Sequence, residues 1–266
     1  MDKEINVFIL IFCRNLDLFY GSELIFKTLR VGFPNAKITV LDNGSLPSAI
    51  DEIKILAREN DCLFEEIYPP GIQHHDFLQN TIRMTADRKG AKGPLVFLDP
   101  DICLWDSCED FSFDGLIAGR AIGRFYDQCT KTLTMPRLHT SFLWIEDPAE
   151  LQREIRKQIV KRFDFHPFLS FSFRFDETWY RFDTGANLFA AIPDRVSWFT
   201  EDHLNRYDHI FCGSHIDWIL DDLDEKNRKL MVDTHELAKN GCLEEIKGLW
   251  KYQQEVWEEN NGVPMS

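Results

Sequence analysis

The sequence Pro94-Leu95-Val96-Phe97-Leu98-Asp99-Pro100-Asp101 joins an apolar run directly to two carboxylates one residue apart. Side chains at positions i and i+2 of an extended chain point to the same face. Pro100 fixes its own φ and favours extended geometry at Asp99. The pattern therefore predicts a buried strand that ends by presenting Asp99 and Asp101 together. A hard divalent cation would relieve their mutual repulsion, and an Asp-Pro-Asp turn in water is the alternative explanation.

Two earlier apolar segments also end in polar turns. Residues 5–12 lead into Cys13-Arg14-Asn15, and residues 37–41 lead into Asp42-Asn43-Gly44-Ser45. A segment with helical periodicity follows each of these turns, at residues 16–30 and 46–59, and a third such segment, at residues 74–86, precedes Pro94. This alternation predicts an α/β fold, with a mostly parallel central sheet and helices on both faces. Right-handed crossovers would place the three strand ends along one edge, where open α/β sheets bind their ligands.

The second half of the chain has a less regular pattern. Strands are predicted at residues 115–123 and 139–145, a helix at 149–162, and a strand or helix start at 186–192. Residues 163–175 contain six phenylalanines, which predict a strand or flap whose rings fill the core, with an apolar acceptor wall as the alternative. Residues 235–260 are predicted to form an exposed helical region.

The composition is that of an acidic, soluble globular protein. Its 266 residues carry a formal net charge of −14, and 44% of them are hydrophobic. This acidity disfavours binding to nucleic acid, whose phosphates require clustered Lys and Arg. The seven cysteines are odd in number and form no Cys-x-x-Cys, which indicates reduced thiols and a cytoplasmic location. No apolar run has the length of a transmembrane segment, and peripheral contact with a membrane stays open.

The order of these features resembles the GT-A fold of glycosyltransferases, and most closely its family-2 type. The first strand end, the Leu41-Asp42-Asn43-Gly44-Ser45 turn and the later Asp99-x-Asp101 pair carry the resemblance, which spans residues 5–220. The resemblance implies transfer of a sugar from a nucleotide sugar, with UDP as the expected nucleotide, to an acceptor hydroxyl. The acceptor would be a glycan, a lipid-linked molecule or another hydroxyl compound.

The resemblance also implies a division of the chain. We expect a catalytic domain over residues 1–240, with a nucleotide-binding half near 1–110 and an acceptor half near 111–240. Residues 241–266 would form a C-terminal helical tail.

The resemblance assigns Asp99 and Asp101 to a Mn²⁺ or Mg²⁺ ion that bridges the donor diphosphate. Asp101 is expected to be the firmer ligand, and Asp99 to act partly through water or the ribose. A histidine late in the chain would be the third ligand. We favour His215 over His209, because Gly213-Ser214 permits a tight turn before it and Asp217 is its neighbour. An imidazole beside two carboxylates suits Mn²⁺ better than Mg²⁺.

Further site residues follow from the same resemblance. Asp42, Asn15 and Arg14 are the candidates for binding the nucleoside, with Asp42 ranked first. Asp183, within Phe182-Asp183-Thr184-Gly185, is the candidate catalytic carboxylate, and Asp217 is the second candidate. Asp183 would act as a base in an inverting transfer, whereas a retaining transfer requires none. A turn aspartate before Gly185 is the structural alternative.

Two other functions are compatible with the sequence. A nucleotidyltransferase would normally carry a phosphate loop rich in glycine and lysine after its first strand, and Phe12-Cys13-Arg14-Asn15 lacks one. A non-catalytic relative of the same fold would bind a sugar or a partner protein. Transfer to DNA or RNA is a minority hypothesis because of the acidic charge.

Overall fold

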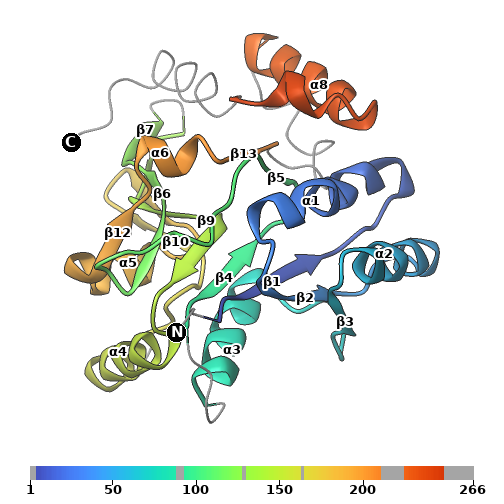
Figure 1. The fold of residues 1–266 in the computed structure, drawn as a ribbon. Helices are drawn as coiled ribbons and strands as arrows, with labels where there is room; N and C mark the ends of the chain where they lie inside the picture. The colour runs from blue at the N-terminus through green and yellow to red at the C-terminus, as the bar shows by residue number, and fades with distance from the viewer. Residues whose placement is uncertain (1–3, 88–92, 128–129, 163–164, 211–224, 249–266) are drawn as a thin grey trace.

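A seven-stranded sheet forms the centre of the computed structural model, which describes residues 4–87, 93–127, 130–162, 165–210 and 225–248. The strands lie in the order β12-β6-β9-β4-β1-β2-β3. Strand β9 is antiparallel to both of its neighbours, and the other neighbouring pairs are parallel. Helices cover both faces of this sheet (Figure 1). The predicted α/β class, with a mostly parallel central sheet, is therefore confirmed.

The bounds of the regular elements follow in chain order. The strands of the described chain are β1 (Asn6–Ile11), β2 (Lys37–Asp42), β3 (Leu63–Glu66), β4 (Leu95–Leu98), β5 (Ile102–Leu104), β6 (Ile117–Ile122), β7 (Phe125–Asp127), β8 (Thr132–Thr134), β9 (Arg137–Ile145), β10 (Phe171–Phe175), β11 (Thr178–Phe182), β12 (Val196–Trp198) and β13 (Tyr207–His209). The helices are α1 (Phe19–Gly32), α2 (Pro47–Glu59), α3 (His74–Asp87), α4 (Pro148–Lys161), α5 (Ala186–Ala191), α6 (Glu201–Leu204) and α8 (Glu225–Lys239). Short 3-10 helices are η1 (Leu16–Leu18), η2 (Pro193–Arg195) and η4 (Leu243–Ile246).

The central sheet has a separate hydrophobic core on each face. Val7, Ile9 and Ile11 of β1 alternate onto the face covered by α1 and α2, and all three are fully buried. Phe97 of β4 belongs to the opposite core, which α3 and α4 cover. Strands buried on both faces are almost continuously apolar, and this explains the Leu-Val-Phe-Leu sequence of β4. The first half of the chain could be predicted because this pattern is local.

A ribbon of two short strands extends from the carboxyl end of β4. Strand β5 pairs antiparallel with β13, and their register sets Ile102 opposite His209 and Leu104 opposite Tyr207. Its two strands are about a hundred residues apart in the sequence, since the Asp101–His209 separation is 108. The sequence analysis did not predict either strand, because three-residue strands give too few positions for a periodicity. This ribbon brings His209 to Asp101.

The phenylalanine-rich segment corrects one prediction. Phe168 is fully buried, but Phe171, Phe173 and Phe175 of β10 are 37%, 45% and 63% exposed. They belong to a hairpin, β10–β11, that continues into a second sheet in the order β10-β11-β8-β7. The prediction that these rings fill the core is wrong for β10, because the hairpin belongs to a separate sheet and its rings stay exposed.

Two predictions near the end of the chain can be compared with the structure. The segment at 186–192, predicted as a strand or the start of a helix, forms helix α5 over Ala186–Ala191. Helix α8 begins at Glu225, earlier than the predicted residue 235, and ends at Lys239. The predicted tail beyond residue 248 lies outside the described residues. Among the described helices, none is long and apolar enough to cross a lipid bilayer.

Candidate functional site

Two carboxylates and one imidazole converge at the carboxyl edge of the central sheet. Asp99 and Asp101 follow β4, and His209 is the last residue of β13. The ligand atoms of these three side chains all lie within 4.8 Å of one another. Nε2 of His209 lies 3.1 Å from Oδ1 of Asp101, and both side chains are 9% exposed. We call Asp99, Asp101 and His209 the edge cluster.

The backbone of the edge cluster is held from three directions. The Asp99 amide donates to the Ser141 carbonyl of β9 at 2.8 Å, and the Ile25 amide of α1 donates to the Pro100 carbonyl at 3.1 Å. The Ile210 amide, just after β13, donates to the Asp101 carbonyl at 3.1 Å. The turn is therefore fixed before any ligand binds, which is what an efficient binding site requires.

The electrostatics of the edge cluster favour a positive ion. Burial, and then the charge of Asp101, raise the pKa of Asp99 well above its ordinary value. Burial lowers the pKa of His209, but the charge and hydrogen bond of Asp101 outweigh it, so the pKa of His209 is raised. Both shifts reflect two carboxylates close together, with Asp101 buried and Asp99 partly buried, so that their negative charges stabilise a nearby positive charge. Two carboxylates with one imidazole are a donor set that fits Mn²⁺.

Two further histidines lie beside the edge cluster. Nε2 of His74, at the start of α3, is 3.9 Å from Oδ1 of Asp99. The ring of His139 on β9 is centred 5.1 Å from that of His209, and its Nδ1 lies 2.7 Å from Oγ of Ser141. Burial lowers the pKa of His74 to about 4 and the pKa of His139 well below its ordinary value. Both imidazoles are therefore neutral at pH 7.

Arg120 lies in a β-bulge of β6, where the register with β9 shifts between Gly119 and Ala121. Bulges re-aim side chains and are common beside active sites. The Arg120 side chain is half-buried, and burial lowers its pKa. Its charge acts on the pKa values of His139 and His209, which places it near the edge cluster. Among the described residues its guanidinium makes no hydrogen bond or ion pair, although the charge of Asp208 acts to raise its pKa.

Asp183 follows β11 and is held by several groups. Its Oδ2 lies 2.9 Å from Nη2 of Arg137, and its Oδ1 accepts hydrogen bonds from the Thr184 amide at 2.9 Å and from Oγ of Ser170 at 3.3 Å. Gly185 then adopts a φ of 86°, which begins α5. The charge of Asp183 acts on the pKa of His74, so Asp183 lies on the side of the site where α3 begins.

The turns after β1 and β2 lie next to the edge cluster, because β1 lies between β4 and β2. Asp42 is 1% exposed, and its carboxylate accepts hydrogen bonds from the amides of Gly44 at 3.0 Å and Ser45 at 3.2 Å. Asn15 caps η1 by accepting from the Asp17 amide, and the Arg14 guanidinium lies 4.2 Å from the centre of the Phe12 ring. Asn15 and Arg14 are exposed, whereas Asp42 holds its own turn in shape.

The structure thus brings some sequence candidates together and leaves others untested. Asp99 and Asp101 lie side by side as predicted. Among the described residues, His209, which the sequence analysis ranked below His215, is the histidine that groups with them as a potential metal ligand. His215 and Asp217 lie outside the described residues. The sequence analysis did not single out His74, Arg120, Arg137 or His139. The predicted strand began at residue 139, and extending it to residue 137 would have set Arg137 and His139 on one face by their i, i+2 spacing.

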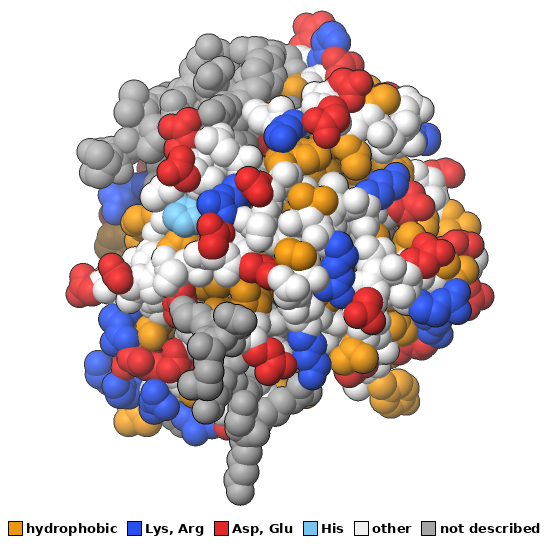
Figure 2. Space-filling view, viewed as in Figure 1, with side chains coloured by type: hydrophobic (Ala, Val, Ile, Leu, Met, Phe, Trp, Pro, Cys, Tyr) orange, Lys and Arg blue, Asp and Glu red, His pale blue; other side chains and the backbone are white. Residues whose placement is uncertain are grey.

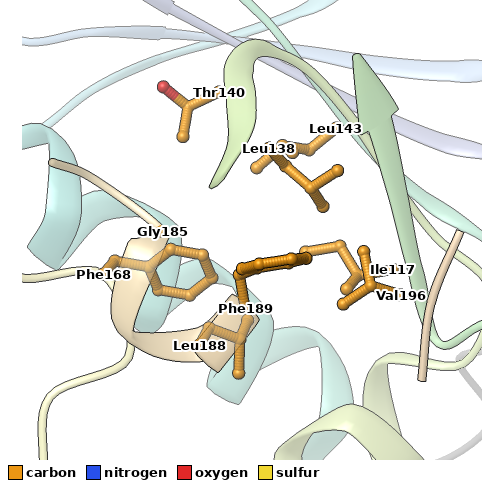
Figure 3. A pocket seen from close by; sticks show the side chains of 9 residues that line it. All are labelled: Ile117, Leu138, Thr140, Leu143, Phe168, Gly185, Leu188, Phe189 and Val196. Carbon is orange, nitrogen blue, oxygen red and sulfur yellow. The ribbon is translucent and has the colours of Figure 1, made fainter. Parts of the chain in front are cut away.

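An apolar cavity beneath α5 is a packing feature, not a ligand site. It lies between β9 and α5, where Leu138, Leu143 and Phe168 converge on Phe189 (Figure 3). Its volume of about 10 Å³ is close to the minimum for one water molecule. The sticks in Figure 3 are apolar apart from the Thr140 hydroxyl, which points away from the others. The cavity cannot admit a nucleotide or a sugar.

The visible surface agrees with the acidic composition. In Figure 2, Lys and Arg side chains are interspersed with Asp and Glu side chains over the described part of this face. On this face, the described residues form no continuous basic stripe of the kind that binds a phosphate backbone.

Comparisons with known proteins add a likeness of fold. No protein-family model matches the sequence, and no curated protein sequence matches it. Solved structures that match include the glycosyltransferase GlyE of Streptococcus pneumoniae TIGR4, at 13% identity over 77% of this chain and 47% of GlyE, with a TM-score of 0.44. The bifunctional glycosyltransferase WbbM matches at 10% identity over 90% of this chain and 45% of WbbM, with a TM-score of 0.49.

A third match is the mannosyltransferase PcManGT of Pyrobaculum calidifontis, solved with GDP-Man and Mn²⁺. It has 10% identity over 88% of this chain and 63% of that protein, with a TM-score of 0.39. This chain thus spans about half the length of GlyE and WbbM. With TM-scores below 0.5, these likenesses carry no argument about activity, which has to be argued from the site itself.

Proposed function

We propose that this protein is a metal-dependent glycosyltransferase that moves a sugar from a UDP-linked donor to an acceptor hydroxyl. The observation that carries the proposal is the convergence of Asp99, Asp101 and His209 at the carboxyl edge of β1, β2 and β4. Open α/β sheets bind nucleotides at this edge. A nucleotide sugar presents a diphosphate whose charge requires a cation, and the edge cluster has the donor set for one.

The metal and its neighbours would act on the donor diphosphate. A Mn²⁺ or Mg²⁺ ion held by Asp99, Asp101 and His209 would stabilise the negative charge that develops on the leaving nucleoside diphosphate. Arg120 would contact the same phosphates, because its half-buried guanidinium makes no hydrogen bond or ion pair with the described residues and a bidentate oxyanion would engage it. The neutral His74 would orient the donor by hydrogen bonding.

The turns after β1 and β2 would receive the nucleoside. Asn15 and Arg14 are exposed there and have polar groups that can meet a base or ribose. The carboxylate of Asp42 is engaged by the amides of its own turn, so it would contribute by shaping the nucleoside site. For direct contact with a base, the Asp42 carboxylate would have to accept a further hydrogen bond besides those from Gly44 and Ser45.

Asp183 would serve the acceptor side of the reaction. In an inverting transfer its carboxylate would take the proton from the acceptor hydroxyl as the new glycosidic bond forms. Arg137 would hold Asp183 in orientation through their 2.9 Å contact. Asp217, which lies outside the described residues, is the second candidate for this role.

The hairpin β10–β11 supplies a surface for the acceptor. Phe171 stacks on Phe182 with ring centres 4.8 Å apart, and Phe173 stacks on Tyr180 at 5.3 Å. We call these four side chains the aromatic ladder. Phe171 and Phe173 are 37% and 45% exposed, and such aromatic surface suits the apolar C–H face of a pyranose, so a glycan is the acceptor class that fits it best. The position of the aromatic ladder favours acceptor binding, because Asp183, the candidate base, follows Phe182 directly in the chain.

Calorimetric titration tests the proposal most directly. UDP, GDP, CDP and dTDP would each be titrated into the protein with Mn²⁺ and again with EDTA, with Asp101→Asn as the site variant and Asp87→Asn, on the exposed end of α3, as the control. We expect UDP to bind only with Mn²⁺, and Asp101→Asn to remove that binding. If no nucleotide binds, the proposal is wrong.

Turnover separates the remaining alternatives. Hydrolysis or transfer of the sugar of UDP-glucose or UDP-galactose, followed as UDP release, identifies a transferase. Nucleotide binding without UDP release from any donor would indicate a non-catalytic relative. Pyrophosphate release from a nucleoside triphosphate and a sugar phosphate would indicate a nucleotidyltransferase.

A further inference from the structure

A second group of potential metal ligands lies outside the edge cluster. It consists of His75 and Asp76, at the start of α3, and His166, in the segment between α4 and β10. We call these three residues the α3 cluster. Nε2 of His166 is 3.5 Å from Oδ1 of Asp76, and Nε2 of His75 is 3.6 Å from Oδ2 of Asp76. His74, the preceding residue, faces Asp99 instead, so consecutive histidines serve two different clusters.

The contacts within the α3 cluster are longer than ordinary hydrogen bonds, and its ligand atoms lie close enough together for a shared ion to join them. Nitrogen-to-oxygen hydrogen bonds span about 2.7–3.2 Å, which is shorter than both contacts. Zinc bonds of about 2.0–2.1 Å in tetrahedral geometry place neighbouring ligand atoms roughly 3.4 Å apart. One ligand atom from each of the three residues lies within 4.8 Å of the others, and the contacts of 3.5 and 3.6 Å use different oxygens of Asp76, so a shared ion would draw the groups slightly closer. The rings of His75 and His166 also meet edge to face, at 84°.

The α3 cluster is held in place from both of its segments. The His166 carbonyl accepts a hydrogen bond from Nδ2 of Asn187 at 3.1 Å, and the adjacent Pro167 carbonyl accepts from the Leu188 amide at 3.0 Å. Phe77 of α3 is buried in the core beneath it. Metal sites are tightest where the ligands need not move to form them.

The exposure of the three side chains leaves a path for an ion. Side chains of His75 and His166 are 22% and 26% exposed, and that of Asp76 is 47% exposed. Nδ1 of His166 is buried and has no partner in the described chain, so the nitrogen open to a ligand is the Nε2 that faces Asp76. Three protein ligands with an open side allow water as a fourth ligand.

We propose that His75, Asp76 and His166 bind a Zn²⁺ ion that ties the 165–170 segment to α3. Two imidazoles and one carboxylate suit zinc, whereas the two carboxylates of the edge cluster suit a harder ion. The ion would stabilise the segment that leads into β10, and it would thereby help to position the aromatic ladder, which begins at Phe171. This inference does not rest on the proposed function, because its ligands form a different set.

Zinc titration in a variant that lacks the edge cluster tests the proposal. The double variant Asp101→Asn/His209→Gln would be stripped of metal with chelator and titrated with ZnCl₂ by calorimetry. We expect one Zn²⁺ per chain. In that background, His166→Gln should weaken binding by at least about 10–100-fold, as losses around zinc sites do, while His203→Gln on α6 should leave it unchanged.

Two further readouts keep the test decisive. Co²⁺ bound by nitrogen and oxygen gives visible bands without the near-ultraviolet thiolate band that cysteine ligation would add. If His166→Gln fails to fold by circular dichroism, Asp76→Asn replaces it, with Asp87→Asn of the same helix as the control. Hydrogen exchange should show slower exchange at residues 165–170 when Zn²⁺ is added.

The proposal is overturned if the double variant binds no Zn²⁺, or if the cluster and control variants bind it equally. It is also overturned if Co²⁺ shows a thiolate band, which would assign the ion to cysteines. If the wild-type protein does not bind UDP, only the proposed function is contradicted, because the zinc test uses no nucleotide.

Discussion

Nε2 of His209 and Oδ1 of Asp101 lie 3.1 Å apart in a site where both side chains are 9% exposed. The contact joins residues 108 positions apart in the sequence, through the β5–β13 ribbon. Removing one partner of a buried charged pair leaves the other uncompensated, which is strongly destabilising. The pair therefore has to be tested by substitutions that keep a hydrogen-bonding group.

His209→Gln should weaken Mn²⁺ binding by about 10–100-fold, because it removes an imidazole ligand and keeps a polar amide. Calorimetric titration with MnCl₂ measures the change. His203→Gln, outside the site, is the control, and His215→Gln tests the residue that the sequence favoured. Unchanged Mn²⁺ affinity in His209→Gln, with a loss in His215→Gln, would restore the ranking made from sequence.

Arg120→Gln should lower the affinity for UDP by about 10–100-fold, equal to about 1.4–2.7 kcal/mol, and leave binding of uridine unchanged. The reason is that a guanidinium contacts phosphate and not the nucleoside. Arg156→Gln, on the exposed surface of α4, is the control. Equal losses for uridine and UDP would show that Arg120 only supports the fold around the bulge.

Asp183→Asn should reduce turnover by about 100-fold or more while changing UDP affinity little, since it removes a base that acts on the acceptor. The measurements are the rate of UDP release and the dissociation constant of UDP. A parallel loss of both quantities would assign Asp183 a structural role in the turn before α5. Turnover that survives the substitution would point to a retaining transfer or to Asp217.

Phe173→Ala should raise the apparent KM for a glycan acceptor and leave the KM for the donor unchanged. Phe173 is 45% exposed, so its removal costs little stability compared with a buried phenylalanine. Val160→Ala, an exposed apolar residue of α4, is a matched control. If acceptor KM is the same in both variants, the aromatic ladder does not bind the acceptor.

Asp42→Ala should lower the free energy of unfolding by about 1–3 kcal/mol, because the amides of Gly44 and Ser45 would lose their acceptor. Urea denaturation measures this change. Asp51→Ala, on the exposed surface of α2, should change stability by less than about 0.5 kcal/mol. Weaker UDP binding at unchanged stability would instead favour direct contact with the nucleoside.

Local patterns carried most of what could be predicted from the sequence. The β4 run and the i, i+2 spacing of Asp99 and Asp101 are adjacent in the chain, and the helices between the first strands have clear periodicity. The approach of His209 to Asp101 could not be predicted, because it depends on a pairing between two three-residue strands. Arg120 depends on a register shift in β6, for which no sequence signal was recognised. Strand β10 is as rich in apolar residues as a buried strand, so the sequence pattern wrongly predicted that its exposed rings fill the core.

The β5–β13 ribbon also means that the residues of the edge cluster are synthesised at different times. A ribosome that adds about 5–20 residues per second needs roughly 5–20 s to pass from Asp101 to His209 across their separation of 108 residues. During that interval the nascent chain carries the two aspartates without their imidazole. In the proposed function, tight metal binding therefore requires that His209 has been synthesised and that the β5–β13 ribbon has formed.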